Sequence, residues 1–79
     1  MTLTVLLFAS YADALGRREL DVQVGPGATV GDLVARIRAG GHDRLPPRPL
    51  VAVNQEYAAY DRVLATGDEV ALIPPVAGG

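Results

Sequence analysis

The chain has 79 residues, 49% of them hydrophobic and 20% charged, with a net charge of −2. This length fits one small globular domain with a small core and little room for a ligand cavity of its own. Cysteine is absent and all seven basic residues are arginines. That composition excludes disulfides, thiolate metal sites, a thiol nucleophile and a side-chain amine for a Schiff base or an isopeptide bond. The cysteine-free composition is compatible with the reducing cytoplasm, and any chemistry is expected to be completed by a partner protein.

Residues 2–9 predict a first strand with three aliphatic residues on one face and two threonines, Leu6 and Phe8 on the other. Two positions remain open for Phe8, which lies either in the core or in a docking patch on the outer face. The apolar run at residues 5–9 is too short to span a bilayer, and no charged segment precedes it. Neither a transmembrane helix nor an export signal is therefore predicted.

Residues 10–16 predict a short helical turn or loop that stops at Gly16. Residues 19–24 then alternate strictly between acidic or polar side chains and Leu or Val, which is typical of a half-buried strand. We expect this strand to pair with the first one as a hairpin. Only Arg17 and Arg18 are adjacent among the arginines, so no basic stripe for nucleic acid is predicted.

One amphipathic helix is predicted from Thr29 to the glycines at 40 and 41. Thr29 and Asp32 have the spacing of a capping box, and apolar residues then recur with helical periodicity. Arg36 and Arg38 fall in the last turn, where cations interact favourably with the helix dipole. The Pro-rich segment 42–49 predicts a loop, and His42 within it is interpreted as a solvated side chain, so no metal site is expected.

The remaining elements are a buried strand at 50–53, a turn at Asn54, a short extended piece at 56–58, turns at 61–64 and 66–68, and a last strand at 69–73. In the last strand Val70 and Leu72 face one side, whereas Ala71 and Ile73 face the other. This order predicts an α+β domain at residues 1–73, with a mixed sheet of about five strands and one main crossing helix, as in the β-grasp (ubiquitin-like) fold. We expect the strands before and after the helix to be parallel neighbours at the sheet centre.

Residues 74–79 form a predicted flexible C-terminal tail. Pro74 and Pro75 stiffen its start, and Gly78 and Gly79 make its tip thin and permissive. A frayed terminus is one interpretation. The other is a rod that carries the carboxylate of Gly79 into the active site of another protein. A carboxylate is inert toward nucleophiles until it becomes an activated ester, so this interpretation requires a nucleotide-consuming partner.

The sequence resembles the small subunit of molybdopterin synthase, the MoaD-like sulfur carriers, over essentially the whole chain. The segments that carry the resemblance are residues 5–9, 29–33, 52–55 and 64–79, the last with Gly-Asp-Glu-Val-Ala and the terminal Pro-Pro-Val-Ala-Gly-Gly. A bare Gly-Gly ending would be weak, whereas this longer ending is specific. The family commonly carries Arg-Glu where this chain has Ala12 and Asp13, which leaves a partner salt bridge from that arginine in doubt.

The resemblance implies a β-grasp carrier in cytoplasmic molybdenum cofactor biosynthesis, without a bound cofactor and not an enzyme on its own. Gly79 would be adenylated by an E1-like enzyme with ATP and converted to a thiocarboxylate by a sulfur donor system. The tail would insert into the MoaE-like large subunit, which supplies the catalytic residues, and would donate sulfur to cyclic pyranopterin monophosphate within a heterotetramer. The tail residues are Pro74, Pro75, Val76, Ala77, Gly78 and Gly79. Phe8 and Ile73 would form the partner-docking patch.

Three alternatives remain open at this point. The same carrier chemistry could serve thiamine thiazole or cysteine synthesis, although thiamine-type carriers usually lack the Pro-Pro. A protein modifier would attach Gly79 to lysines of target proteins. A plain interaction domain would have an incidental tail, and deletion of Gly79 separates it from the others.

Overall fold

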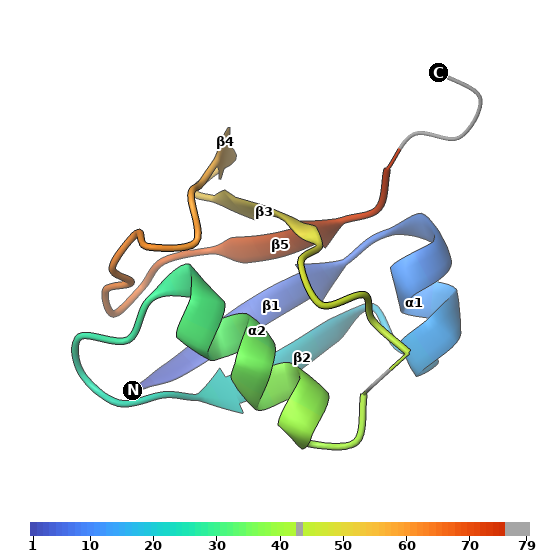
Figure 1. The fold of residues 1–79 in the computed structure, drawn as a ribbon, viewed down its shortest axis with the longest axis horizontal. Helices are drawn as coiled ribbons and strands as arrows, with labels where there is room; N and C mark the ends of the chain where they lie inside the picture. The colour runs from blue at the N-terminus through green and yellow to red at the C-terminus, as the bar shows by residue number, and fades with distance from the viewer. Residues whose placement is uncertain (43, 76–79) are drawn as a thin grey trace.

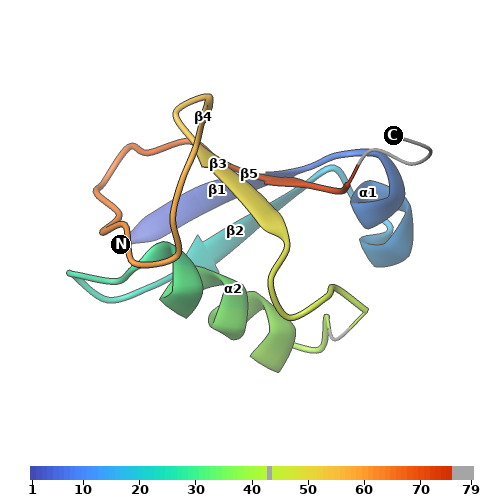
Figure 2. The same ribbon diagram turned by 45° about the horizontal axis from the view of Figure 1, so that its top comes forward.

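The computed structural model describes residues 1–42 and 44–75, which form one mixed β-sheet and two helices (Figure 1). The elements in chain order are β1 (Thr2–Leu7), α1 (Ala9–Leu15), β2 (Glu19–Gln23), α2 (Val30–Ala39), β3 (Leu50–Val53), β4 (Glu56–Tyr57) and β5 (Val70–Ile73). Helix α2 crosses one face of the sheet, and no helix of residues 1–42 or 44–75 covers the other face (Figure 2). The predicted β-grasp fold is confirmed.

The sheet order is β2-β1-β5-β3-β4. Strand β1 pairs antiparallel with β2 and parallel with β5, and β5 pairs antiparallel with β3. The expectation that the strands flanking the main helix would be neighbours was wrong. Strands β2 and β3 run in the same direction, but β1 and β5 lie between them. Strand β2 pairs only with β1, its hairpin partner, and therefore lies at the edge of the sheet. The last strand, β5, pairs with both β1 and β3, so the parallel pair at the centre of the sheet is β1–β5.

The core lies between α2 and the facing side of the sheet. Alternation in β1 buries Leu3, Val5 and Leu7 to 4% exposure or less, as predicted. They pack with the apolar stripe of α2, which consists of Val30, Leu33, Val34 and Ile37. Burial of apolar surface at about 25 cal/mol per Å² is the main stabilising contribution for a domain of this size.

The ends of α2 follow the predicted local signals. The backbone N–H of Asp32 donates to Oγ1 of Thr29 at 3.2 Å, and the backbone N–H of Thr29 donates to Oδ2 of Asp32 at 2.9 Å. This reciprocal pair is a capping box, and it satisfies two of the donors that an open helix start leaves unpaired. The helix ends at Gly40, whose N–H donates to the carbonyl oxygens of Arg36 and Ile37.

Specific contacts fix the segment between β1 and β2 and the loop between α2 and β3. The predicted turn at 10–16 is the short helix α1, and it ends at Gly16 in the left-handed region with φ +71°. In the predicted loop after α2, Leu45 is fully buried and its carbonyl oxygen accepts from Nε of Arg38 at 3.1 Å. Tyr60 donates its hydroxyl to the carbonyl of Pro49 and carries the Arg48 guanidinium 4.2 Å above its ring centroid. These contacts fix the loop against the domain.

His42 lies half-buried in the same loop. Within residues 1–42 and 44–75, no group of three or more His, Cys, Asp or Glu side chains is placed to hold a metal ion. Over the same residues, neither helix is long and apolar enough to cross a membrane.

Candidate functional site

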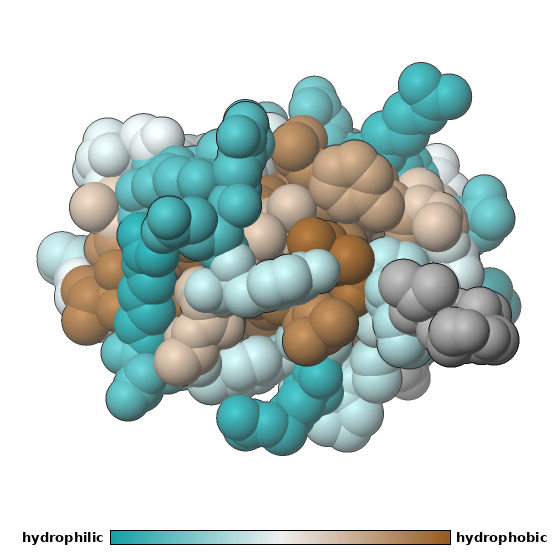
Figure 3. Space-filling view, turned by 90° about the horizontal axis from the view of Figure 1, so that it is seen from above, coloured by the Kyte–Doolittle hydropathy of each residue, from teal (hydrophilic) through white to brown (hydrophobic). Residues whose placement is uncertain are grey.

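An apolar hollow lies on the helix-free face of the sheet. Eight residues line it: Leu6, Phe8, Ala52, Gln55, Tyr57, Glu69, Ala71 and Ile73. The view from above shows a brown, hydrophobic area in the middle of the surface with hydrophilic residues around it (Figure 3). Because an exposed apolar area of this kind on a small domain marks a contact site, the apolar hollow is the candidate functional site.

Strand register assembles the apolar hollow from four strands. Leu6 of β1 is opposite Ala71 of β5, Ala71 is opposite Ala52 of β3, and Ala52 is opposite Tyr57 of β4. Residues in register share a face of the sheet, so these four side chains form one row. The two alanines in the middle are short and lie between larger neighbours. The face is therefore hollowed along the centre of the row.

Phe8 and Ile73 both line the apolar hollow, so the structure brings together the two residues that the sequence suggested for docking. Phe8 directly follows β1 and has extended backbone angles, φ −121° and ψ 151°, before α1 begins. Its side chain is 48% exposed, which settles the alternative between core and surface in favour of the surface. Ile73 faces away from the buried Val70 and Leu72, as alternation predicted. Their role in docking stays a prediction.

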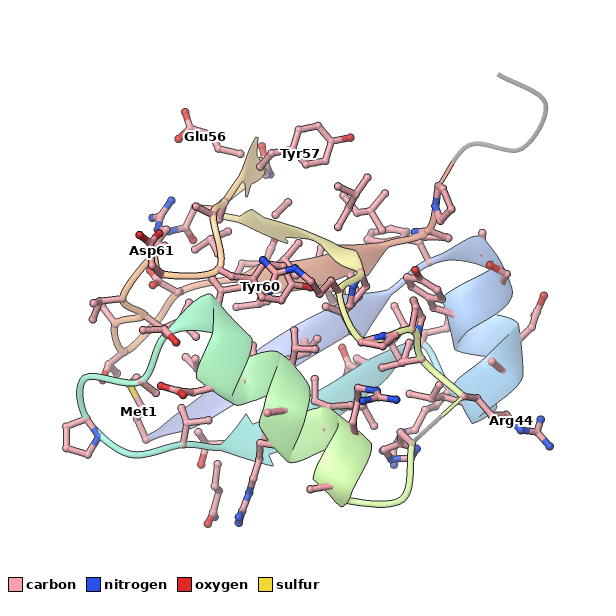
Figure 4. All side chains as sticks on the ribbon, viewed as in Figure 1. Met1, Arg44, Glu56, Tyr57, Tyr60 and Asp61 are labelled. Carbon is pink, nitrogen blue, oxygen red and sulfur yellow. The ribbon has the colours of Figure 1, made fainter. Side chains whose placement is uncertain are left out.

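Sequence reasoning missed two large exposed residues on this side of the sheet. The first is Tyr57, which is 73% exposed and projects outward from the edge strand β4 (Figure 4). Tyr60, by contrast, lies near α2 on the other side (Figure 4). Leu50 was expected in a buried strand, but it is 51% exposed because it pairs in register with Ile73 on the helix-free face. Strand alternation places residues 50 and 52 on the face opposite to residues 51 and 53, and this pattern could have indicated that Leu50 lies on the outer face. No local signal singled out Tyr57.

A polar network holds the edge of the apolar hollow where β4 begins. Asn54 and Gln55 both have positive φ, +53° and +71°, and form the turn between β3 and β4. The side-chain amide of Asn54 donates to Oδ1 of Asp68 at 2.9 Å, and its Oδ1 accepts from the N–H of Glu69 at 3.0 Å. The other carboxylate oxygen of Asp68 accepts from the N–H of Ala65 at 2.8 Å. The turn that carries Gln55 is thereby tied to the chain that enters β5.

The same network changes the acidity of Asp68. Hydrogen bonds from the Ala65 N–H and from the Asn54 amide stabilise the carboxylate and hold the pKa of Asp68 below its ordinary value of 3.8. Among the residues that the structure describes, the apolar hollow is lined by one carboxylate, that of Glu69, and by no histidine. It therefore presents a mainly apolar surface for contact.

The tail leaves the sheet beside the apolar hollow. Strand β5 ends at Ile73, which lines the hollow, and the next residues are the half-buried Pro74 and the exposed Pro75. The predicted tail residues Val76, Ala77, Gly78 and Gly79 lie outside the described residues. The apolar hollow is thus directly followed in the chain by the segment that was predicted to enter a partner.

Comparison with protein families matches residues 5–79 to the ThiS family. The chain belongs to the ThiS family. This ThiS-family chain is 39% identical, over the full length of both proteins, to the molybdopterin synthase sulfur carrier subunit of Chlamydomonas reinhardtii. It is also 39% identical to small archaeal modifier protein 1 of Haloferax volcanii, over 92% of this chain and 95% of that protein.

Two solved structures share the fold of this chain over its full length. The crystal structure of the Haloferax volcanii modifier superposes with a TM-score of 0.85 at 36% identity, covering the whole of both chains. A chain from the complex of subunits 1 and 2 of the molybdopterin-converting factor of Helicobacter pylori superposes over both full lengths with a TM-score of 0.71 at 21% identity, which is a likeness of fold.

Proposed function

We propose that this chain is the sulfur carrier subunit of a molybdopterin synthase and that Gly79 carries the transferred sulfur. The ThiS-family match and the full-length likeness to a molybdopterin synthase sulfur carrier subunit support this assignment. The observation that carries the proposal is the apolar hollow beside the end of β5, because a partner that covers the hollow also receives the tail.

Docking positions the tail. The MoaE-like large subunit covers the apolar hollow with an apolar surface of its own, and Phe8, Tyr57 and Ile73 are the large side chains that it buries. Pro74 and Pro75 restrict the backbone where the tail leaves the domain, because proline fixes φ near −65°. Gly78 and Gly79 lack side chains, so nothing beside the reacting carbonyl blocks the approach to it. The complex from Helicobacter pylori pairs a chain of this fold with a second subunit.

The chemistry requires activation before sulfur transfer. An E1-like enzyme uses ATP, and the Gly79 carboxylate attacks the α-phosphorus, with pyrophosphate as leaving group. A sulfur donor system then replaces AMP on the Gly79 carbonyl and leaves a thiocarboxylate. In the large subunit two thiocarboxylated chains each pass one sulfur to cyclic pyranopterin monophosphate, which supplies the two sulfur atoms of the dithiolene. Water regenerates the C-terminal carboxylate of each chain. This chain binds no cofactor in the cycle and supplies only its carboxyl group and its docking surface.

Deletion of Gly79 tests the proposal in a reconstituted reaction with the activating enzyme, a sulfur donor, the large subunit and cyclic pyranopterin monophosphate. The full chain is expected to yield molybdopterin. The shortened chain is expected to bind the large subunit with nearly unchanged affinity, since its apolar hollow is intact, and to yield none. Molybdopterin formation by the shortened chain would contradict the proposal.

A second candidate is a protein modifier, which the 39% identity to small archaeal modifier protein 1 favours specifically. In this function the same activated Gly79 carbonyl is attacked by a lysine amine of a target protein, and an amide bond forms. Digestion of whole-cell protein and a search for peptides whose lysine carries the C-terminal residues of this chain tests it. Such peptides are expected only if the chain acts as a modifier.

A further inference from the structure

We propose that this chain is a donor only: its activated C-terminus is not built into amide-linked copies of the chain. The inference rests on the proposed activation of Gly79, and it holds for the carrier and for the modifier function alike. It follows from the nucleophiles that the sequence and the structure provide, one class at a time.

Transfer from an acyl-adenylate that ends in an amide requires an amine, either directly or after a thioester formed on a thiol. An amine nitrogen attacks the Gly79 carbonyl carbon, the C–N bond forms, the C–O bond to AMP breaks, and one proton is released to solvent. The sequence offers no lysine and no cysteine to do this. Its seven basic side chains are arginines, whose guanidinium groups stay protonated and lack a free electron pair for attack. No side chain can therefore form an isopeptide or a lasting thioester.

The α-amino group of Met1 is engaged by the fold. Its nitrogen donates to the carbonyl oxygen of Val24 at 2.8 Å, and Met1 is half-buried. The methionine side chain packs against the core, and its sulfur accepts from Oγ1 of Thr66 at 3.6 Å. Attack by this amine requires loss of the hydrogen bond to Val24 and withdrawal of Met1 from its site. Transfer to this group is thereby disfavoured.

The remaining nucleophile with a basic nitrogen is His42, which is half-buried. An acyl group on an imidazole nitrogen is hydrolysed readily, so attack there returns the free carboxylate and no linked product. An activated pool of this chain is consequently consumed by water or by partners and is not built into amide-linked copies of itself. As a carrier it keeps its sulfur for the acceptor, and as a modifier it adds one unit to a target without chain extension.

The Arg44→Lys variant supplies the missing nucleophile with the charge preserved. Arg44 is exposed and projects away from the body of the domain (Figure 4), so a lysine there is open to attack a second copy. Each chain is prepared as a C-terminal thioester of a small thiol and incubated at high concentration at about pH 10, near the ordinary pKa of a lysine amine of about 10.4, so that the introduced lysine is partly unprotonated and able to attack. Intact-mass analysis then measures the species that contains two linked copies. The activating enzyme is not needed in this assay.

The variant is expected to form about tenfold more linked species than the unmodified sequence. In the unmodified sequence the Met1 amine must first lose its hydrogen bond to Val24, and one hydrogen bond of a charged donor lowers its availability by about that factor. Added free lysine is expected to capture both thioesters equally, which shows that both are reactive. Equal linkage in the two proteins would overturn the proposal, as would single copies throughout despite capture by free lysine. The proposed function is tested separately with Gly79 deleted, so either idea can fail alone.

Discussion

Replacing Phe8 by alanine removes a large apolar side chain from the apolar hollow and leaves the core in place. Phe8 is 48% exposed, in contrast to its neighbour Leu7, which is 4% exposed and belongs to the core. The substitution is therefore expected to reduce affinity for the large subunit more than it reduces the free energy of unfolding. This contrast separates a docking role from a structural one.

The magnitude follows from the exposed area. An aromatic side chain buries about 150–250 Å² when fully covered, so the exposed half of Phe8 offers about 70–120 Å² to a partner. At about 25 cal/mol per Å², covering that area contributes about 2 kcal/mol or somewhat more. The expected result is a roughly thirtyfold rise in Kd, as for a central apolar contact.

Calorimetric titration against the large subunit measures the affinity, and urea unfolding of the free chain measures the stability. Val63→Ala is the matched control, because Val63 is 60% exposed and lies outside the apolar hollow. Leu7→Ala is the core control, with an expected stability loss of about 2–5 kcal/mol. If Phe8→Ala binds as tightly as Val63→Ala, or loses stability as Leu7→Ala does, the docking argument is refuted.

Three further substitutions test the site and the fold. Tyr57→Ala is expected to weaken large-subunit binding at least fivefold with little loss of stability, because the side chain is 73% exposed; titration and urea unfolding compare the two effects. For Asp68→Asn, the lowered pKa means that the carboxylate stabilises the fold above its ordinary pKa of 3.8 and that this stabilisation is lost as pH falls through the lowered value. The difference in Tm between the wild type and Asp68→Asn should therefore shrink from pH 7 to about pH 2, and a constant difference would contradict the assignment. Thr29→Ala removes one half of the capping box and should cost about 1 kcal/mol in urea unfolding, with large-subunit affinity unchanged.

The local features of the fold could be predicted because their signals span only a few residues. Alternation fixed the buried faces of β1 and β2, the Thr29–Asp32 spacing fixed the start of α2, and Gly67 marks a turn with φ +89°. Each of these features depends on the backbone period or on one cap, so neighbouring residues suffice to determine it.

The order of strands could not be read in the same way. Strand β5 inserts between β1 and β3 through backbone pairing across more than sixty residues of chain, from Val5 to Val70. Helix length and handedness constrain such a crossover but do not say which strand occupies the centre. The expectation that β2 and β3 would be neighbours was wrong because these local rules do not determine the order of strands in the sheet.

The candidate site was predictable in part. Alternation placed Ile73 opposite the buried face of the last strand, but it left Phe8 open between the core and the outer face. The register of β1, β5, β3 and β4 brings both residues beside Ala52 and Tyr57. The hollow shape depends on where short alanines meet large residues of other strands, which is a property of tertiary pairing. The predicted role of Gly79 still rests on the sequence and the family.

The mass of the intact protein isolated from its native cells, followed by fragmentation of its C-terminal peptide, tests the central claim most directly. The sulfur carrier function predicts a population in which one oxygen of the Gly79 carboxylate is replaced by sulfur. Gly79 joined to lysines of other proteins, with no thiocarboxylate found, would contradict it and assign the chain as a modifier.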